Sequence, residues 1–439
     1  MHLLQQIVFI LCAGTAIGIF TKKVVEVRRN ILLGRDENLT DQSGRRWRNV
    51  LLLAFGQKKM FKRPLPAVLH FFVYAGFVLI NIEVLEILID GIFGTERIFQ
   101  APLGAFYNVV IGFFEILAIL TLIAVIVFLI RRNILKVKRL SMHELDGFPK
   151  RDANTILYIE IVLMCMLLLM NAMEGAIQLK EGVGNGFLIS SLIAPLFTGL
   201  SLDMLNIIKH TCWWGHILGI FAFLNYLPYS KHFHILLAFP NAFYTRLTPQ
   251  SKMANMPEVQ NEVLYMMQPE LAPTATDAAP VQHRFGAKDV MDLSWKNLLD
   301  AYSCTECGRC TSVCPANITG KKLSPRKIMM DTRDRLEEVG ENINKNKNFV
   351  DDGKSLVHDY ISVEELRACT TCQACVEACP VSIEPLSIIN QLRRYLIMEE
   401  SNAPQEWNLM SSNIENNMAP WKFSPDDRDK WANEMEPSA

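Results

Sequence analysis

The sequence predicts an all-α protein in which a transmembrane helical bundle of about five spans is followed by a soluble α-helical domain. Half of the 439 residues are hydrophobic and 20% are charged, which is too apolar for a soluble protein and too charged for a membrane bundle alone. Long apolar runs occur only in the first half of the chain. Eight of the 11 cysteines fall between Cys304 and Cys379, and this clustering indicates cofactor ligands and not disulfides.

Five apolar runs are each long enough to cross about 30 Å of hydrocarbon. They are residues 3–20, 66–89, 105–130, 155–177 and 210–228. Residues 186–205 are also apolar, but Pro195 and Gly199 interrupt them, which favours an interfacial or re-entrant segment on the outer side; a sixth span is the alternative. The first run has no Ala-x-Ala-like cleavage site, so we expect a retained helix and not a signal peptide.

Lysine and arginine are unevenly distributed between the connections. Residues 21–65 hold twelve and residues 131–153 hold seven, whereas 90–104 and 178–209 hold only Arg97, Lys180 and Lys209. The positive-inside rule therefore predicts a multi-pass protein of the inner (cytoplasmic) membrane with its N-terminus outside and its C-terminal domain in the cytoplasm. The formal net charge of −1 shows no basic excess, so nucleic acid is not an expected partner.

Composition divides the chain into four segments. Residues 1–247 form the transmembrane domain and 248–290 a linker, which includes the Pro/Ala/Thr-rich stretch from Gln268 to Gln282. Residues 291–400 form the soluble domain, and 401–439 form a C-terminal tail. The tail carries tryptophans among polar residues without clear periodicity, so docking to a partner and a loosely ordered terminus are both open.

The soluble domain contains two copies of the run C-x2-C-x2-C-x3-C-P. They are Cys304, Cys307, Cys310 and Cys314, and Cys369, Cys372, Cys375 and Cys379. This is the bacterial run for [4Fe-4S] clusters, in which the fourth cysteine ligates the cluster of the other run. We therefore expect Cys379 to complete the first cluster and Cys314 the second. Zinc is the alternative because paired C-x2-C also binds it, but zinc leaves four cysteines per run and the trailing Cys-Pro unexplained.

The 54 residues between the two runs are rich in charged residues and Asn, which indicates helix and loop and hence an α-helical ferredoxin-like domain. The segments that begin Trp295-Lys-Asn-Leu-Leu and Ala368-Cys-Thr-Thr-Cys resemble those of heterodisulfide-reductase-like iron-sulfur oxidoreductases over roughly residues 290–398. Such proteins often hold their catalytic cluster in a module of Cys-Cys-Gly repeats, and this sequence has no Cys-Cys dipeptide. The resemblance implies a separate partner for that chemistry, and we assign no catalytic residue here.

Several histidines lie in or beside the apolar spans, where ionisable residues are costly and usually functional. They are His70, His210, His216, His232 and His234. On one continuous helix, His216 and His234 would share a face about 27 Å apart, because 18 residues make five turns. Pro228 lies between them and introduces a kink that shifts their phase.

The stretch Leu227–Ile235 resembles the end of the last helix in the cytochrome b (gamma) subunit of respiratory nitrate reductase. In that family two b haems are stacked across the bilayer, each held by one His from each of two helices. The resemblance implies that His70 and His234 hold a haem b on the cytoplasmic side and that His216 corresponds to a ligand of a second haem. The partner position of His216 falls near Ile80 and Asn81, so the second haem stays open. Interfacial or hydrogen-bonded structural roles are the alternative for these histidines.

Acidic residues also lie in or near the spans, and they fit either proton or quinone contacts or ordinary pairing. They are Glu83, Glu86, Glu115, Glu160 and Glu174. No G-x-x-x-x-G-K-[ST] or G-x-G-x-x-G occurs, so nucleotide and flavin sites of those kinds are not predicted.

Together these features predict a membrane-bound electron-transfer subunit that passes electrons between a cytoplasmic redox partner and the quinone pool through two [4Fe-4S] clusters and haem b. Resemblance suggests an electron-transfer flavoprotein or a Cys-Cys-Gly-type iron-sulfur protein as the soluble partner. The alternative is a haem-free membrane anchor, or a redox sensor, that docks a ferredoxin domain to another protein.

Overall fold

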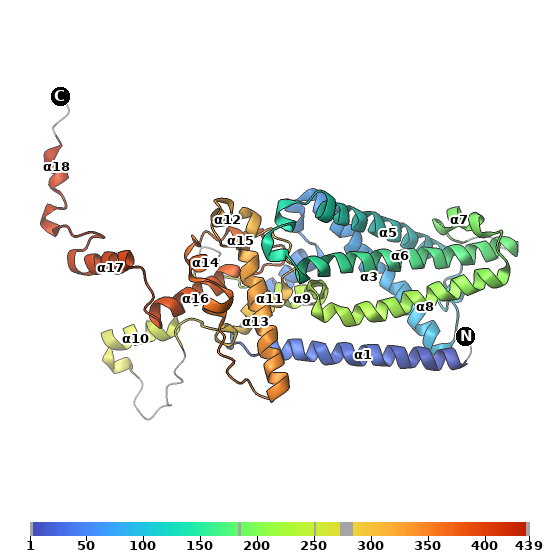
Figure 1. The fold of residues 1–439 in the computed structure, drawn as a ribbon, viewed down its shortest axis with the longest axis horizontal. Coiled ribbons are helices and arrows are strands. Elements are labelled where there is room, and N and C mark those ends of the chain that lie inside the picture. Colours follow the sequence, from blue (N-terminus) through green and yellow to red (C-terminus); the bar gives the residue numbers. More distant parts are fainter. Residues whose placement is uncertain (1–2, 183–185, 250–251, 273–283, 436–439) are drawn as a thin grey trace.

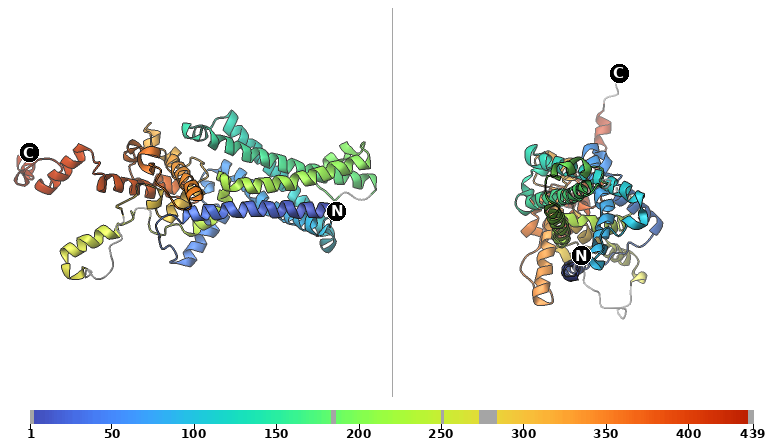
Figure 2. Two further views of the ribbon diagram at one scale, coloured as in Figure 1. Left: turned by 60° about the horizontal axis from the view of Figure 1, so that its bottom comes forward. Right: turned by 90° about the vertical axis from the view of Figure 1, so that its right-hand side faces the viewer.

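The computed structural model describes residues 3–182, 186–249, 252–272 and 284–435. These residues form helices and turns without a β-strand. Figure 1 shows a long helical bundle with a smaller helical domain against one end, and the two further views in Figure 2 agree. The predicted all-α class is therefore confirmed.

Five helices in the described ranges are long and apolar enough to cross a membrane, which confirms the predicted number of spans. They are α1 (Leu3–Ile31), α3 (Pro64–Phe93), α5 (Ala105–Leu129), α6 (Phe148–Lys180) and α8 (Leu202–Tyr226). Most are longer than the apolar runs because the helix continues into polar residues; α1, for example, ends with Arg28 and Arg29 in its last turn. Residues 186–205 hold only the short helix α7 (Ser190–Ile193) and a 3-10 turn, Ala194–Phe197, before α8 begins.

Small residues bring the spans close together. A Cβ atom at Gly215 of α8 would lie 3.0 Å from Met166 Sδ of α6, and one at Gly219 would lie 2.8 Å from Leu163 Cδ2. Within a membrane, where hydrophobic driving force between helices is weak, such close approach lets van der Waals contact hold helices together. The α6–α8 pair consequently forms the most extensive helix contact of the bundle.

The segment after α8 is not a continuous helix. Pro228 lies in a 3-10 turn, Leu227–Tyr229, which is followed by a second turn, Lys231–Phe233, and then by α9 (His234–Phe243). The common face expected for His216 and His234 on one helix therefore does not exist, because the chain changes direction between them. Instead, α9 packs against α11 (Trp295–Ser303) of the second domain.

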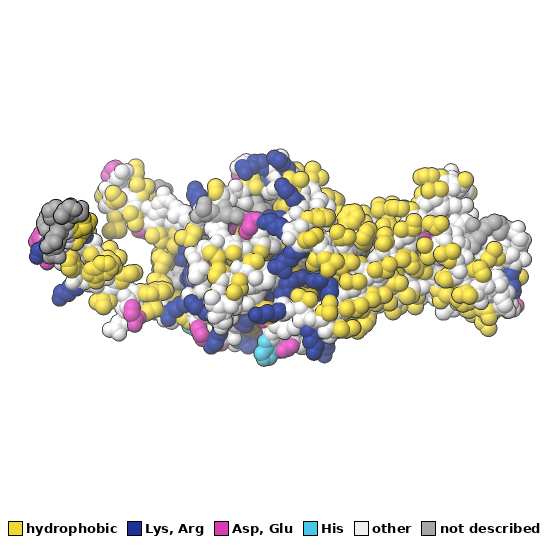
Figure 3. Space-filling model, turned by 90° about the horizontal axis from the view of Figure 1, so that it is seen from above, with side chains coloured by type: hydrophobic (Ala, Val, Ile, Leu, Met, Phe, Trp, Pro, Cys, Tyr) yellow, Lys and Arg dark blue, Asp and Glu magenta, His cyan; other side chains and the backbone are white. Residues whose placement is uncertain are grey.

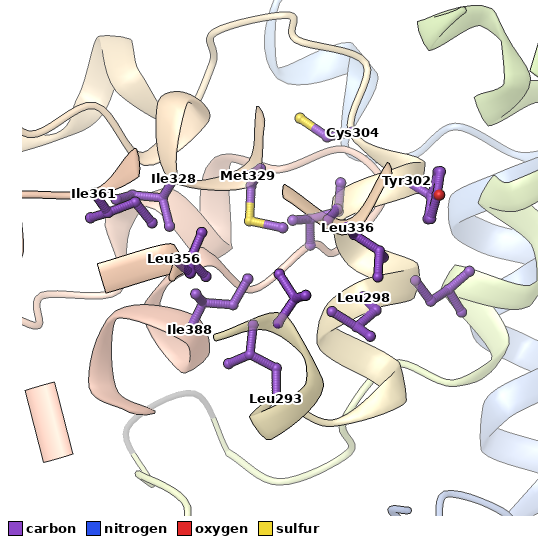
Figure 4. Close-up of a cluster of buried hydrophobic side chains, with 14 of the residues drawn as sticks. Leu293, Leu298, Tyr302, Cys304, Ile328, Met329, Leu336, Leu356, Ile361 and Ile388 are labelled. Carbon is purple, nitrogen blue, oxygen red and sulfur yellow. The ribbon is translucent and has the colours of Figure 1, made fainter. Parts of the chain in front are cut away.

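The second domain is formed by α11 and five further helices around one core. They are α12 (Pro315–Ile318), α13 (Pro325–Asn346), α14 (Val363–Arg367), α15 (Ala374–Ala378) and α16 (Pro385–Met398). Figure 4 shows its buried side chains, including Leu298, Met329 and Ile388. Ser294, Ser324 and Ser362 precede α11, α13 and α14 and accept backbone N–H groups as N-caps.

This core is continuous with the bundle. Val27 of α1 and Phe223 of α8 belong to the same buried cluster as Leu298, so the domain is packed on the spans and not merely tethered to them. Ala287 and Val290 also belong to this core, a few residues before the expected boundary at 291. In the linker, α10 (Pro257–Met267) has no buried residue, and residues 273–282 of the Pro/Ala/Thr-rich stretch lie outside the described residues.

The two basic connections lie where the bundle meets the second domain. The first contains α2 (Ser43–Asn49) and turns at Val50–Phe55 and Met60–Lys62, and the second contains turns at Ile130–Ile134, Lys138–Leu140 and His143–Leu145. Figure 3 shows Lys and Arg side chains as a band at this junction, next to the apolar surface of the bundle. Both connections therefore lie on the same side as the cysteine runs.

The C-terminal tail forms helices despite its weak periodicity. It contains α17 (Gln405–Asn417) and α18 (Lys430–Glu434), which extend away from the domain in Figures 1 and 2. No described residue of α17 is buried. Its Trp407 lies under the guanidinium of Arg367, 5.9 Å from the ring centre, which is a contact with the domain at the start of the tail.

Candidate redox centres

The fold brings the two cysteine runs together and mixes them. Cys304 and Cys310 interact electrostatically with Cys307 and with Cys379 of the other run, and Cys310 also lies near Cys375, where the two groups adjoin. Cys369 and Cys375 interact with Cys372 and with Cys314 in the same way. This grouping is the one that a crossed pair of [4Fe-4S] clusters needs.

Within the described residues, no three His, Cys, Asp or Glu side chains converge closely enough to hold a single metal ion. The four thiolates of an iron-sulfur cubane bind four different irons, so they stand further apart than the ligands of one ion. Each mixed group takes three cysteines from one run and the fourth from the other run. The inner group is Cys304, Cys307, Cys310 and Cys379, and the outer group is Cys369, Cys372, Cys375 and Cys314.

The chemistry of both groups suits iron. Burial raises the pKa of Cys304 and of Cys375 to about 12 and that of Cys379 to about 11. Such thiols become thiolates only where a cation compensates the charge, as iron does. The backbone N–H groups of Thr371 and Ile383 donate to Cys369 Sγ at 3.4 Å and Cys379 Sγ at 3.3 Å, and hydrogen bonds of this kind stabilise charge on cluster sulfur.

The two groups differ in their surroundings. The inner group touches the basic connections of the bundle: Arg139 donates to the backbone oxygen of Cys307, and Lys59 donates to Ser382 Oγ at 3.3 Å beside Cys379. In the outer group, by contrast, Cys372 is exposed. The inner group is therefore the one that contacts both basic connections of the bundle.

A cavity of about 460 Å³ connects the inner group to the middle of the bundle. Its wall is mostly apolar, and Cys307 and Arg309 lie at one end. Four of the candidate histidines also line it: His70, His216, His232 and His234. A mostly apolar cavity of this size with a few convergent polar groups is typical of a cofactor or ligand site.

His70 and His234 face each other across this cavity, although they come from α3 and α9. Their ring centres are 6.5 Å apart. A metal–imidazole bond is about 2 Å long, so two imidazoles on opposite sides of one metal hold their ring centres roughly 6 Å apart. Each Nδ1 has an acceptor, Gln57 Oε1 at 3.0 Å for His70 and the Lys231 oxygen at 3.1 Å for His234. Because Nδ1 is hydrogen-bonded in each ring, Nε2 of each ring is left to bind a metal, as in most metal-bound histidines. The pair therefore fits one haem.

Among the other histidines, His232 also lies near His234, but their ring centres are 5.5 Å apart with the rings nearly perpendicular, which is closer than two imidazoles on one metal stand. His216 is buried at 1% exposure, and Ile80 and Asn81, at the position expected for its partner, line the same cavity. His232 contacts Phe223 with tilted rings whose centres are 5.3 Å apart, and its Nε2 lies 3.8 Å from Glu160 Oε1. His210 is exposed.

Most of the acidic residues in the spans are paired at the outer end of the bundle. Arg97 donates to Glu174 at 2.9 Å and to Asn171 at 3.0 Å. Glu115 Oε2 accepts the backbone N–H groups of Leu188 and Ile189, which fixes the segment before α7. In the sequence analysis Arg97 appears only as one charge in a connection. No local pattern predicts its pairing with Glu174, which lies 77 residues away.

The structure also shows ion pairs between the two domains that the sequence does not predict. Glu306, inside the first cysteine run, pairs with Lys231 of the turn before α9 and with Arg333 of α13. Arg246 joins Glu37 and Glu384, and Arg326 joins Glu144. These partners are far apart in the sequence, and no periodicity or spacing predicts them.

Comparison with known proteins agrees with the cysteine geometry. A family model described as a 4Fe-4S dicluster domain matches residues 303–383. The probable iron-sulfur-binding oxidoreductase FadF of Bacillus subtilis is 29% identical over 98% of this chain and 61% of its own length. The EtfAB:quinone oxidoreductase of Syntrophomonas wolfei is 28% identical over 92% of this chain and 56% of its own.

A third relative matches a shorter part of the chain. It is one component of the ferredoxin/F(420)H(2)-dependent CoB-CoM heterodisulfide reductase of Methanosarcina acetivorans, and it is 34% identical over 24% of this chain and 53% of its own length. No solved structure matches the chain. The chain thus spans about three fifths of the first two relatives. It contains a 4Fe-4S dicluster domain, and its relatives are iron-sulfur oxidoreductases, as the resemblance predicted.

Proposed function

We propose that the chain is a membrane-bound electron-transfer subunit that carries electrons between a soluble partner in the cytoplasm and quinone in the inner membrane. The observation that carries this proposal is the cavity that joins the facing rings of His70 and His234 to Cys307. When bound, [4Fe-4S] clusters and haem b each take up and release one electron at a time. The chain supplies their ligands, their relative positions and a dry surrounding.

The residues have distinct roles in this proposal. The inner and outer cysteine groups would each hold one [4Fe-4S] cluster, and the exposure of Cys372 supports the outer one as the site that exchanges electrons with the partner. His70 and His234 would hold haem b beside the inner group. His216 has no facing imidazole among the described residues, so we propose one haem and not two.

The relatives support the choice of partners. One is named EtfAB:quinone oxidoreductase, which favours quinone as the membrane substrate and an electron-transfer flavoprotein as the soluble partner. Similarity to a component of a heterodisulfide reductase favours an iron-sulfur protein as the other candidate. The basic connections touch the cluster domain, and basic connections remain in the cytoplasm, so that domain is assigned to the cytoplasmic side.

The test is a reduced-minus-oxidised visible spectrum of the purified full chain and of two variants, His70→Ala and His234→Ala. We expect b-type haem bands in the wild type and the loss of the same haem in each variant, because either substitution removes one axial ligand. Iron and acid-labile sulfide of the clusters should remain at about eight each, since two cubanes hold that number. His210→Ala is the matched control, because His210 is exposed and outside the cavity.

A wild-type protein with intact clusters and no haem absorption would reject the electron path and favour the haem-free anchor or redox sensor. Haem that survives both substitutions and is lost in a His216 variant would show that the pair is assigned incorrectly.

A further inference from the structure

The cavity has a second polar region, deeper in the bundle, that the proposed haem pair does not use. Glu160 of α6 and His216 of α8 both line it. Within the described part of the chain, neither His216 Nε2 nor Glu160 Oε2 has a hydrogen-bond partner, although both atoms are buried. Buried polar groups are almost always hydrogen-bonded, because an unsatisfied one costs free energy. Arg132 Nη1, in the turn after α5, is also buried without a partner, and Arg132 lines the same cavity. His216 Nε2 and Glu160 Oε2, which lie within the spans, therefore indicate a ligand with polar groups at that depth.

The structure fixes how His216 presents this atom. His216 is 1% exposed, and its Nδ1 lies 3.0 Å from the backbone oxygen of Leu163, which can only accept a hydrogen bond. Nδ1 therefore carries the hydrogen, and in the neutral ring Nε2 is an acceptor. Leu163 lies three residues after Glu160 on α6, so His216 contacts α6 within one helical turn of Glu160.

A second haem does not explain His216. A bis-histidine haem needs an imidazole on each face, and the opposing positions on α3 hold Ile80 and Asn81. Both of these side chains line the same cavity as His216, and neither can ligate a haem iron as an imidazole does.

We propose that His216 and Glu160 bind the head group of a quinone or quinol in this cavity. The inference rests on the proposed function and names the place where its membrane substrate binds. A quinone has two oxygen atoms on opposite edges of an apolar ring, which matches two buried polar atoms in an otherwise apolar cavity. Apolar side chains such as Met164 and Ile220 line the wall beside them.

The site also lies next to the proposed haem pair. Glu160 Oε1 is 3.8 Å from His232 Nε2, and the ring centres of His232 and His234 are 5.5 Å apart. A head group at Glu160 would thus be separated from His234 by one side chain.

The two side chains also suit the reaction. Reduction of a quinone to a quinol takes two electrons, delivered singly from the soluble partner through the chain's redox cofactors, and two protons, one for each oxygen. In the quinol state, the neutral His216 Nε2 and the Glu160 carboxylate would each accept a hydrogen bond from one hydroxyl group. On oxidation each would take one proton, becoming an imidazolium and a carboxylic acid, while the two electrons leave singly through the redox cofactors. Quinone reduction returns both protons and both electrons.

The test measures binding and not turnover. Heptyl-hydroxyquinoline-N-oxide is a quinol analogue whose fluorescence is quenched when a protein binds it, and it is titrated into the purified full chain. We expect His216→Gln and Glu160→Gln each to weaken binding about tenfold, because each removes one buried hydrogen bond to the head group. Iron, sulfide and haem content should stay at the wild-type level. His210→Gln and Glu181→Gln are matched controls, since both residues are exposed on the same two helices or their ends.

The outcomes separate this inference from the proposed function. Unchanged binding in both variants, with a wild type that binds, overturns the site but leaves quinone as the substrate. No binding by a wild type that retains clusters and haem rejects quinone itself, and the site with it. Haem loss in His216→Gln would make His216 an axial ligand and overturn the inference.

A second measurement does not depend on variants that fold. An azidoquinone irradiated with the wild-type chain should label peptides of α6 around Glu160 or of α8 around His216. Labelling confined to other helices would contradict the site.

Discussion

Replacing Glu306 by Gln tests how the cluster domain is fastened to the bundle. Glu306 lies between Cys304 and Cys307 and is 4% exposed. It accepts hydrogen bonds from Lys231, in the turn before α9, and from Arg333 Nη1 of α13 at 2.8 Å. One carboxylate therefore compensates two buried cations, one from each part of the molecule.

The size of the effect follows from these contacts. Removing one partner from a buried ion pair costs about 3–5 kcal/mol, because the other charge stays buried without compensation. The lower end applies here, since Arg333 keeps Asp334 at 3.1 Å and Lys231 keeps Asp152 at 3.8 Å. A loss of about 3 kcal/mol changes the folding equilibrium roughly 150-fold. For a domain of this size, the unfolding midpoint should fall by at least about 10 °C.

The assay heats the detergent-solubilised full chain at a fixed scan rate and follows the loss of cluster absorption, because unfolding with cluster loss is irreversible. Glu377→Gln is the matched control. Glu377 also joins the cluster domain to a bundle connection, through Lys62, but both side chains are about half exposed. Exposed pairs contribute no more than about 1 kcal/mol. If Glu306→Gln lowers the midpoint no more than Glu377→Gln does, the argument from burial is wrong.

Three further predictions address the clusters, the topology and pH. Cys314→Ser should damage the cluster of the run Cys369–Cys375 and spare the inner one in electron paramagnetic resonance spectra, because the fourth ligand crosses over; loss of the inner signal alone would contradict the crossing. Protease added to intact cells should leave the cluster domain uncut, and digestion that spares a cytoplasmic marker would contradict the orientation. Burial raises the pKa of Glu37 and of Glu144, but the hydrogen bonds and charges around each carboxylate, chiefly those of Arg246 and Arg326, together outweigh burial and lower both pKa values below the ordinary 4.5. Their contribution to stability is therefore complete above about pH 4.5 and is lost as pH falls through the folded pKa, so a thermal midpoint that stays constant down to pH 3 would refute it.

The sequence predicts those features that depend on local patterns. Apolar runs reveal the five spans because each span must satisfy its own backbone within the bilayer. The cysteine spacing is also a local pattern, because three ligands of each cluster lie within a few residues of one another. The interruption by Pro195 and Gly199 correctly argues against a sixth span, because α7 and the following turn are too short to cross.

Features that depend on where the chain changes direction cannot be predicted from such local patterns. Periodicity places His216 and His234 on one face only if the helix continues, and the turns around Pro228 break it. The approach of His234 to His70 results from this break, and only resemblance suggests that pair. The acidic residues of the spans likewise look alike in sequence, yet Glu115 fixes a backbone segment while Glu160 keeps a free oxygen in the cavity.

The basic connections have a second consequence beyond orientation. Lys59 and Arg139, which contribute to the positive-inside count, lie beside the inner cysteine group, and Arg309 of the first run adds a third cation. Positive charge next to an iron-sulfur cluster stabilises its reduced, more negative form and so raises its potential. The outer group has Arg393 near Cys369. In the proposed function, the cations that contribute to the positive-inside count would therefore also stabilise an added electron on the inner cluster.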